Sequence, residues 1–228
     1  MDQILKQALL MKAVLNEGEM ALINAQAMRP LTEEEVFTFK LAACNNQVDR
    51  DHERFTDGTL EEFAGMFVGR PILRDHEWET KNQTARVYAA SVEPMPGVDG
   101  GKQLVLRCYM LRAGHEDTVA AIEAGIYREC SVGVAVADAI CSVCGVNQRT
   151  GWCEHRGGQE YDGIKCWFEL SGAKDAYEAS MVAVPAQPAA GVIKSKRYGG
   201  PECDPAGGKP AVIGWQDEAL LEIEKNRF

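Results

Sequence analysis

Four side chains that commonly bind metal ions lie close together in the middle of the sequence. Cys141, Cys144, Cys153 and His155 form the pattern C-x2-C-x8-C-x-H. A C-x-x-C turn followed by a close Cys/His pair supplies four donors for a tetrahedral zinc ion. Four protein ligands leave no position for a catalytic water, so the pattern predicts a structural zinc rather than a metallopeptidase. A redox C-x-x-C pair and plain reduced cysteines are the alternatives.

The segment around these residues, 138–162, contains few large apolar side chains. Because it cannot order itself around a core, we expect the metal to supply its folding energy. The other cysteines are scattered, and we expect small buried side chains rather than disulfides at these positions: Cys44, Cys108, Cys130, Cys166 and Cys203.

A second kind of chemistry requires residues far apart in the sequence. Catalysis by a serine needs a base that removes the hydroxyl proton and a third group that orients the base. Among four histidines, His76 is the best placed base, because it follows a short strand-like run at 72–74. A histidine at the end of a strand is also common in purely structural roles.

The nucleophile and the acid are each open to two interpretations. Ser131 lies among small residues, and Gly133 would let backbone approach closely, which suits an oxyanion site. A serine in a tightly packed strand is the alternative. Glu178 lies in an otherwise apolar strand, where a buried carboxylate would need a partner such as an imidazole. The alternative is that Glu178 faces solvent on an alternating strand.

Hydrophobic periodicity predicts a strand-rich chain with short helices between the strands. Period-two and small-residue runs favour strands at 36–42, 72–74, 85–93, 103–111, 129–137, 164–170 and 176–184. Helical spacing favours helices at 1–28, 59–67 and 115–124. This order is typical of a compact α+β fold or a closed β-barrel.

Changes in composition divide the chain into three parts. Residues 1–30 are predicted to form an amphipathic helical arm, and 31–192 the main domain, with the Cys/His segment as an insertion. Residues 193–228 begin with a Gly/Pro-rich linker and end in a predicted short helix.

Charge and hydropathy exclude several classes of function. The 228 residues carry 34 acidic and 24 basic side chains, a formal net charge of −10, so binding to phosphate backbones is not expected. No apolar run approaches the roughly 20 residues that span a bilayer. The N-terminus has no secretory signal pattern, which favours a cytoplasmic location without a membrane partner.

Several short motifs together resemble the prohead proteases of tailed bacteriophages. They occur in the family's order: Asn46 with Asp49-Arg50-Asp51, Gly58, the run from Gly69 to His76, Cys130-Ser131-Val132-Gly133, and Glu178-Ala179-Ser180-Met181-Val182 with Pro185-Ala186. Each motif is weak alone, but their order and spacing over residues 36–192 are more specific.

The resemblance implies a closed, mostly antiparallel β-barrel flanked by short helices, as in herpesvirus assemblins. It also implies His76 as base, Ser131 as nucleophile and Glu178 as the third member, with Glu160 and Glu169 as lesser alternatives. Glu178 lies further from Ser131 than the family pattern suggests, because the Cys/His segment intervenes.

The implied activity is that of a serine endopeptidase of phage head maturation. It would cut scaffold and major capsid protein precursors inside the assembling prohead in the host cytoplasm, as a homo-oligomer. Self-cleavage is expected within about residues 190–210. A non-catalytic capsid-assembly protein and a zinc-stabilised interaction module are the alternatives.

Overall fold

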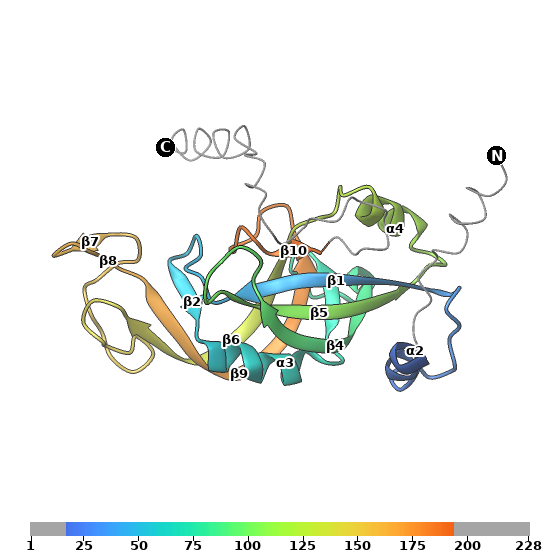
Figure 1. The fold of residues 1–228 in the computed structure, drawn as a ribbon, viewed down its shortest axis with the longest axis horizontal. Coiled ribbons are helices and arrows are strands. Elements are labelled where there is room, and N and C mark those ends of the chain that lie inside the picture. Colours follow the sequence, from blue (N-terminus) through green and yellow to red (C-terminus); the bar gives the residue numbers. More distant parts are fainter. Residues whose placement is uncertain (1–16, 194–228) are drawn as a thin grey trace. The chain divides into compact units, whose positions relative to one another are not determined.

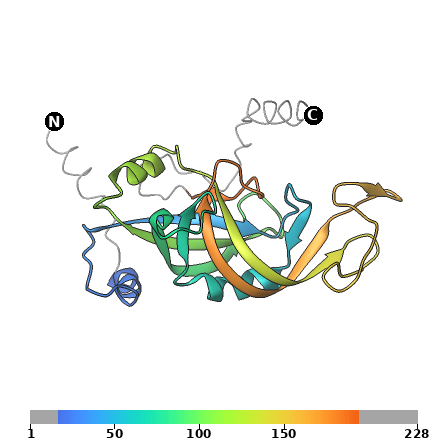
Figure 2. The same ribbon diagram turned by 180° about the vertical axis from the view of Figure 1, so that it is seen from behind.

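The computed structural model describes residues 17–193, which contain one eight-stranded mixed sheet with a small two-stranded hairpin beside it (Figures 1 and 2). The strands of the sheet are β1 (Val36–Asn45), β2 (Glu53–Phe55), β3 (Pro71–Arg74), β4 (Ala85–Pro94), β5 (Lys102–Leu111), β6 (Cys130–Cys141), β9 (Phe168–Met181) and β10 (Gly191–Val192). The hairpin consists of β7 (Glu160–Tyr161) and β8 (Ile164–Lys165). The α-helices described are α2 (Glu17–Asn24), α3 (Asp57–Phe67) and α4 (Glu116–Glu123), with a short 3-10 helix at Thr80–Asn82. Most strands follow the predicted alternation.

The predicted closed barrel is wrong, because the sheet is open. Its strands follow the order β10-β1-β5-β4-β3-β9-β2, with β6 paired to β9. Closure would require β6 to pair along β1 or β10, but the described β-pairing between these edges is a single bridge, Glu129 to Gly191. The fold is therefore a mixed α/β arrangement with an open sheet.

A side chain takes the place of the missing strand pairing at the end of β1. The Asn45 backbone N–H donates to Gln187 Oε1 (2.6 Å), and Gln187 Nε2 donates back to the Asn45 carbonyl (3.2 Å). Both residues are buried. Buried backbone groups need hydrogen-bond partners. The Gln187 carboxamide therefore supplies the partners of the Asn45 N–H and carbonyl that a barrel-closing strand would otherwise supply.

Helix α3 covers part of the sheet and anchors the core. It begins at the cap residue Thr56, whose hydroxyl accepts the N–H of Thr59 (3.2 Å), as N-terminal caps commonly do. Its apolar face buries Leu60, Phe63 and Phe67 completely. This is the helix predicted at 59–67, extended by two residues.

Strands β6 and β9 form one long antiparallel pair that carries the Cys/His segment at its far end. The predicted strands at 164–170 and 176–184 belong mainly to one strand, β9, which pairs with β6 from Cys130–Met181 to Cys141–Phe168. Register shifts after Gly133 and after Ala135 bend the pair. The intervening segment is thus an excursion between adjacent strands, and it begins after Cys141 rather than at residue 138.

The described part of the N-terminal arm packs on the sheet. Ile23 is fully buried, Gln26 Nε2 donates to the Val87 carbonyl (3.1 Å), and Tyr88 donates its hydroxyl proton to Glu19 (3.0 Å). The start of the predicted 1–28 helix and all of the predicted tail helix lie outside the described residues. Within 17–193, no helix is long and apolar enough to cross a bilayer.

Candidate catalytic and metal-binding sites

The structure brings His76 and Glu178 together, although they are 102 residues apart in the chain. His76 Nδ1 lies 2.7 Å from Glu178 Oε1, which is hydrogen-bond distance. Glu178 is on β9, and His76 lies in the turn after β3, which runs parallel to β9. A carboxylate at Nδ1 selects the tautomer with its proton there, so Nε2 can accept a proton from a nucleophile.

Glu178 is 1% exposed, so its carboxylate needs partners. Its second oxygen, Oε2, accepts the Ser180 hydroxyl at 2.6 Å. The Ser180 oxygen in turn accepts the backbone N–H of His76 at 3.1 Å. Ser180 therefore holds both the acid and the backbone of the proposed base. Sequence reasoning gave Ser180 no role, although its position two residues after Glu178 on one strand face could have indicated one.

The turn that carries His76 has an uncommon backbone conformation. Asp75 and His76 have φ values of 51° and 56°, in the left-handed region that non-glycine residues seldom adopt. Each such residue costs about 1–2 kcal/mol. Strain of this kind is retained where the surroundings hold it in place, and it clusters at functional sites.

Ser131 lies on β6 directly opposite Ser180 on β9. Opposed residues of antiparallel strands project from the same face with Cβ atoms about 5 Å apart. Ser131 thus shares a sheet face with Ser180 and Glu178 and is half-buried. Among the described hydrogen bonds, none joins Ser131 to His76. Such bonds are often long in free enzymes and tighten when substrate binds.

Gly133 makes room for a side chain of the neighbouring strand. It faces Glu178 across the β6–β9 pair, and a Cβ atom at this position would collide with Glu178 Oε1. The missing side chain therefore makes room for the buried carboxylate. The -Ser-x-Gly- spacing places the proposed nucleophile and this space on one strand face.

The two alternative acids lie in other places. Glu169 Oε2 lies 3.3 Å from Arg54 Nη2. Glu160 is exposed on β7, in the hairpin beyond the main sheet. Glu178 is the acid that reaches His76.

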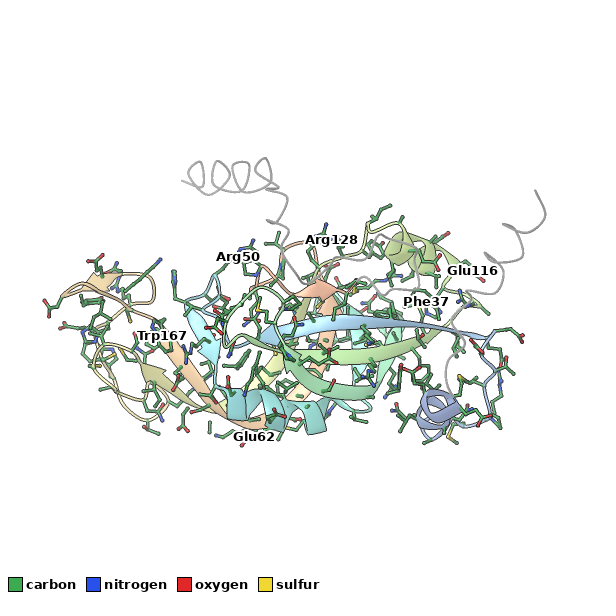
Figure 3. The ribbon with its side chains drawn as sticks, in the orientation of Figure 1. Phe37, Arg50, Glu62, Glu116, Arg128 and Trp167 are labelled. Atoms are coloured by element: carbon green, nitrogen blue, oxygen red, sulfur yellow. The ribbon has the colours of Figure 1, made fainter. Side chains whose placement is uncertain are left out.

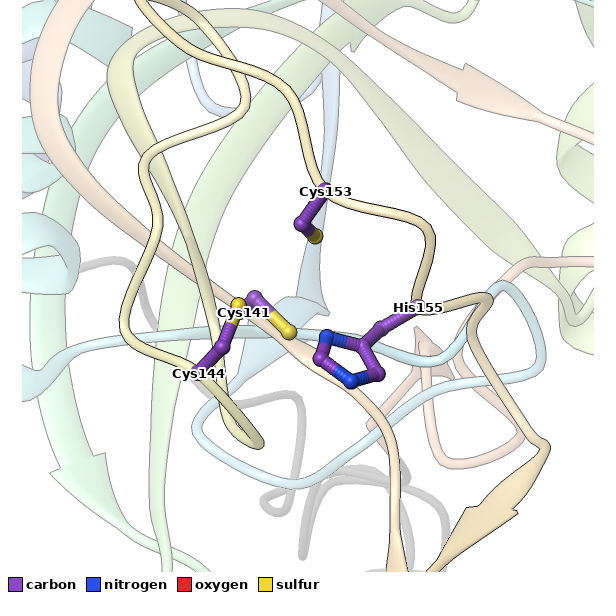
Figure 4. Close-up of side chains that lie close together, drawn as sticks. All are labelled: Cys141, Cys144, Cys153 and His155. Carbon is purple, nitrogen blue, oxygen red and sulfur yellow. The ribbon is translucent and has the colours of Figure 1, made fainter.

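The four predicted metal ligands converge, as Figure 4 shows. The donor atoms of Cys141, Cys144, Cys153 and His155 all lie within 4.8 Å of one another. Zinc–ligand distances of about 2.0–2.3 Å place tetrahedral donors about 3.3–3.8 Å apart, so small side-chain rotations would close this cluster on an ion. His155 Nδ1 is buried without a hydrogen-bond partner among the described residues, which fits a metal ligand.

Local hydrogen bonds favour the thiolate form of two of these cysteines. Burial acts to raise the pKa of the Cys141 thiol, but backbone N–H groups of Cys144 and Val143 outweigh it, and the pKa is lowered. At Cys153 the Gln148 carboxamide, 3.4 Å from Sγ, lowers the pKa of the thiol. Thiolate is the form that binds metal, so the cluster can hold a metal ion.

Cys166 is buried, as predicted, but it lies beside the Cys/His cluster. Its Sγ lies 3.9 Å from Cys141 Sγ, and both side chains are buried. By contrast, Cys44, Cys108 and Cys130 are buried free thiols within the core, as predicted, and burial raises the pKa of Cys130 to about 12. Cys203 lies outside the described residues.

Known proteins provide no identification of this chain. No protein-family model, curated protein or solved structure gives a significant match. The resemblance to phage prohead proteases therefore stays a prediction, and function has to be inferred from the side chains themselves.

Proposed function

We propose that this protein is a serine endopeptidase in which Ser131 attacks the peptide carbonyl, His76 removes its proton, and Glu178 orients His76. The observation that carries the proposal is the 2.7 Å contact between His76 Nδ1 and the buried carboxylate of Glu178. Ser131 supports it by lying on the same face as Glu178, one strand across. These are the three roles that serine catalysis requires.

In the reaction, His76 Nε2 accepts the Ser131 hydroxyl proton as the oxygen bonds to the carbonyl carbon. The same nitrogen then returns the proton to the leaving amine, and a water repeats the sequence to release the acyl group. Glu178 stabilises the imidazolium, and Ser180 keeps the carboxylate and the His76 backbone in place.

The resemblance supplies the biological setting of this proposal. The substrates would be scaffold and major capsid protein precursors, cut inside an assembling phage head in the host cytoplasm by a homo-oligomer of this chain. The proposed metal is zinc, held by Cys141, Cys144, Cys153 and His155, and its role would be to order the segment between β6 and β9.

Labelling with a fluorophosphonate tests the proposal without knowledge of the substrate, because this probe reacts with activated serines. We expect labelling of the wild-type protein at Ser131, identified by peptide mass spectrometry. Ser131→Ala and His76→Ala should abolish labelling, and precursor cleavage should fall by at least about a thousandfold. Glu178→Gln should lose less activity and should cut precursor at least about ten times faster than those two variants, because the third member of a triad contributes less than the nucleophile.

Ser142→Ala, which removes a serine near the metal cluster, is the matched control and should label normally. Labelling that is absent in the folded wild-type protein, or that survives in His76→Ala, would contradict the peptidase. The non-catalytic assembly role would then be the better description.

A further inference from the structure

A groove runs beside β6, and Ser131 lies in its wall. Its volume is about 350 Å³. One side consists of consecutive β6 residues from Cys130 to Val134, together with Val136. The opposite side comes from the end of β1, the turn before β2 and the segment before β10.

The strand that borders this groove has a free outer edge. Over Cys130–Cys141, β6 pairs in the described structure with β9. Bridges cover the outer edge only at its two ends, Glu129 to Gly191 and Ile140 to Asn147. Unpaired N–H and C=O groups of an edge strand are a template for an added strand, so an extended peptide can pair here.

The walls of the groove combine an apolar floor with acidic side chains. Phe55, Val136 and Leu170 are buried apolar residues of the lining. Three carboxylates also line it, against the single cation of Arg149: Asp49, Asp51 and Glu53. A lysine or arginine side chain matches this combination, because its methylene stem packs on apolar surface while its charge reaches the carboxylates.

The acidic side chains are close enough to destabilise one another's charge. Burial raises the pKa of Asp49, and the neighbouring Asp51 raises it further. Burial also raises the pKa of Glu53, with repulsion from Asp49 and Asp51 adding to it. A cation from a ligand would relieve this repulsion.

The turn that carries these carboxylates is held firmly. Asp49 Oδ1 accepts the N–H groups of Asp51 and Glu53, each at 2.9 Å. Arg50, labelled in Figure 3, donates from its guanidinium to the Pro185 carbonyl (2.6 Å) and from its N–H to Ala186 (3.1 Å). A groove wall that is already ordered lowers the entropic cost of binding.

The Cys/His segment supports the same turn from the other side. The His52 side chain lies directly against Gly157 and Gly158: an added Cβ would collide with the His52 Cβ at Gly157 and with the His52 ring at Gly158. The Arg54 guanidinium stacks 4.6 Å over Trp167, labelled in Figure 3, and Arg149 of the segment lines the groove itself. The proposed zinc segment is therefore part of the structure that shapes the groove.

We propose that the groove binds an extended basic segment of a separate polypeptide, which adds as a strand to the outer edge of β6 and places a Lys or Arg side chain between Asp51 and Glu53. The binding does not depend on catalysis. Because Ser131 lines the groove, this Lys or Arg side chain would also lie beside the bond that is cut, a placement that rests on the proposed peptidase function.

Binding to the Ser131→Ala protein tests the inference without turnover. The probe is a synthetic peptide with the chain's own sequence 190–200, AGVIKSKRYGG, which carries Lys194, Lys196 and Arg197. The comparison peptide has these three residues replaced by glutamate. We expect the basic peptide to bind at least about tenfold more tightly, a difference of about 1.4 kcal/mol.

Asp51→Asn combined with Glu53→Gln should remove the preference for the basic peptide, because it removes two negative charges while keeping the shape of both side chains. The control is Asp99→Asn combined with Glu123→Gln, which changes net charge equally on residues outside the groove lining and should keep the preference. Circular dichroism and thermal unfolding would verify that both double variants are folded. Equal binding of the two peptides, or equal loss in both double variants, would overturn the inference.

The same reagents separate this inference from the proposed function. If the Ser131→Ala protein prefers the basic peptide but the wild-type protein neither cuts it nor reacts with fluorophosphonate, the proposed peptide binding is supported and the proposed peptidase activity is contradicted. If the wild-type protein reacts with fluorophosphonate at Ser131 but does not prefer the basic peptide, the proposed peptidase activity is supported and the proposed peptide binding is contradicted.

Discussion

The proposed catalytic cluster and the Cys/His cluster are built in opposite ways. His76 and Glu178 are 102 residues apart and meet because β3 lies beside β9 in a sheet with a large apolar core. Cys141 and His155 are near neighbours in the sequence and meet through a loop with little core of its own. The first arrangement depends on the whole fold, whereas the second depends on local chain geometry and, as we propose, on a metal ion.

This difference predicts how each cluster should fail. A sheet that buries Glu178 tolerates few changes in shape, because interiors are close-packed. A loop held by metal should lose order when one ligand is removed, while the sheet stays folded. The variants below test that contrast, from the largest expected effect to the smallest.

Removal of a metal ligand should have the largest local effect. Cys144→Ser is expected to reduce zinc content from one ion per chain to near zero and to increase amide hydrogen exchange across 142–167. Strands β1, β4 and β5 should keep their protection, and catalysis should weaken only indirectly.

Cys108→Ala, which removes a buried thiol from the core, is the control and should retain the ion. Wild-type protein purified without chelator that contains almost no metal would contradict the proposed zinc site. Global unfolding of Cys144→Ser would instead show that the segment and the sheet are not independent.

Gly133→Ala should damage the proposed catalytic cluster with one added methyl group. The new Cβ would collide with Glu178 Oε1 and displace the carboxylate from His76. We expect precursor cleavage to fall by about a hundredfold and stability to fall by about 1–3 kcal/mol, measured by kinetics and denaturant unfolding.

Gly65→Ala provides the matched control, because nothing lies within 4 Å of a Cβ at this exposed position in α3. It should stabilise the protein by up to about 1 kcal/mol, since glycine is a poor helix former. Full activity in Gly133→Ala would mean that catalysis does not depend on the position of the Glu178 carboxylate.

Ser180→Ala should have an intermediate effect. It removes the 2.6 Å hydrogen bond to Glu178 and the acceptor for the His76 N–H. Loss of partners for buried polar groups costs about 1–3 kcal/mol. We expect about a tenfold lower kcat, a changed pH–rate profile, and fluorophosphonate labelling of Ser131 that persists at a lower rate. An unchanged pH profile would indicate a purely structural role.

Cys166→Ala should have the smallest effect of the four. Its sulfur contacts Cys141 at 3.9 Å but is not one of the four converging donors. We expect one zinc ion per chain to remain, with affinity reduced by about tenfold, as is common for groups that contact a ligand. Complete loss of the ion, measured by competition with a chelator, would make Cys166 a ligand.

The sequence alone was sufficient to predict features that depend on residues close together in the chain. The spacing of Cys141, Cys144, Cys153 and His155 indicated the metal cluster, because ligands on a short segment meet whatever the rest of the fold does. Hydrophobic periodicity likewise indicated α3 and most strands of the sheet, since burial on one face leaves a period in the sequence.

The tertiary structure decided what depends on pairing between distant segments. Whether the sheet closes depends on the outer edge of β6, which carries bridges only near its two ends. The Gln187 carboxamide meanwhile pairs with the Asn45 backbone at the end of β1. The role of Ser180 and the space at Gly133 appear only when β6 and β9 are in register. No periodicity encodes these relations, because they result from which strands lie side by side and which atoms then compete for the same space.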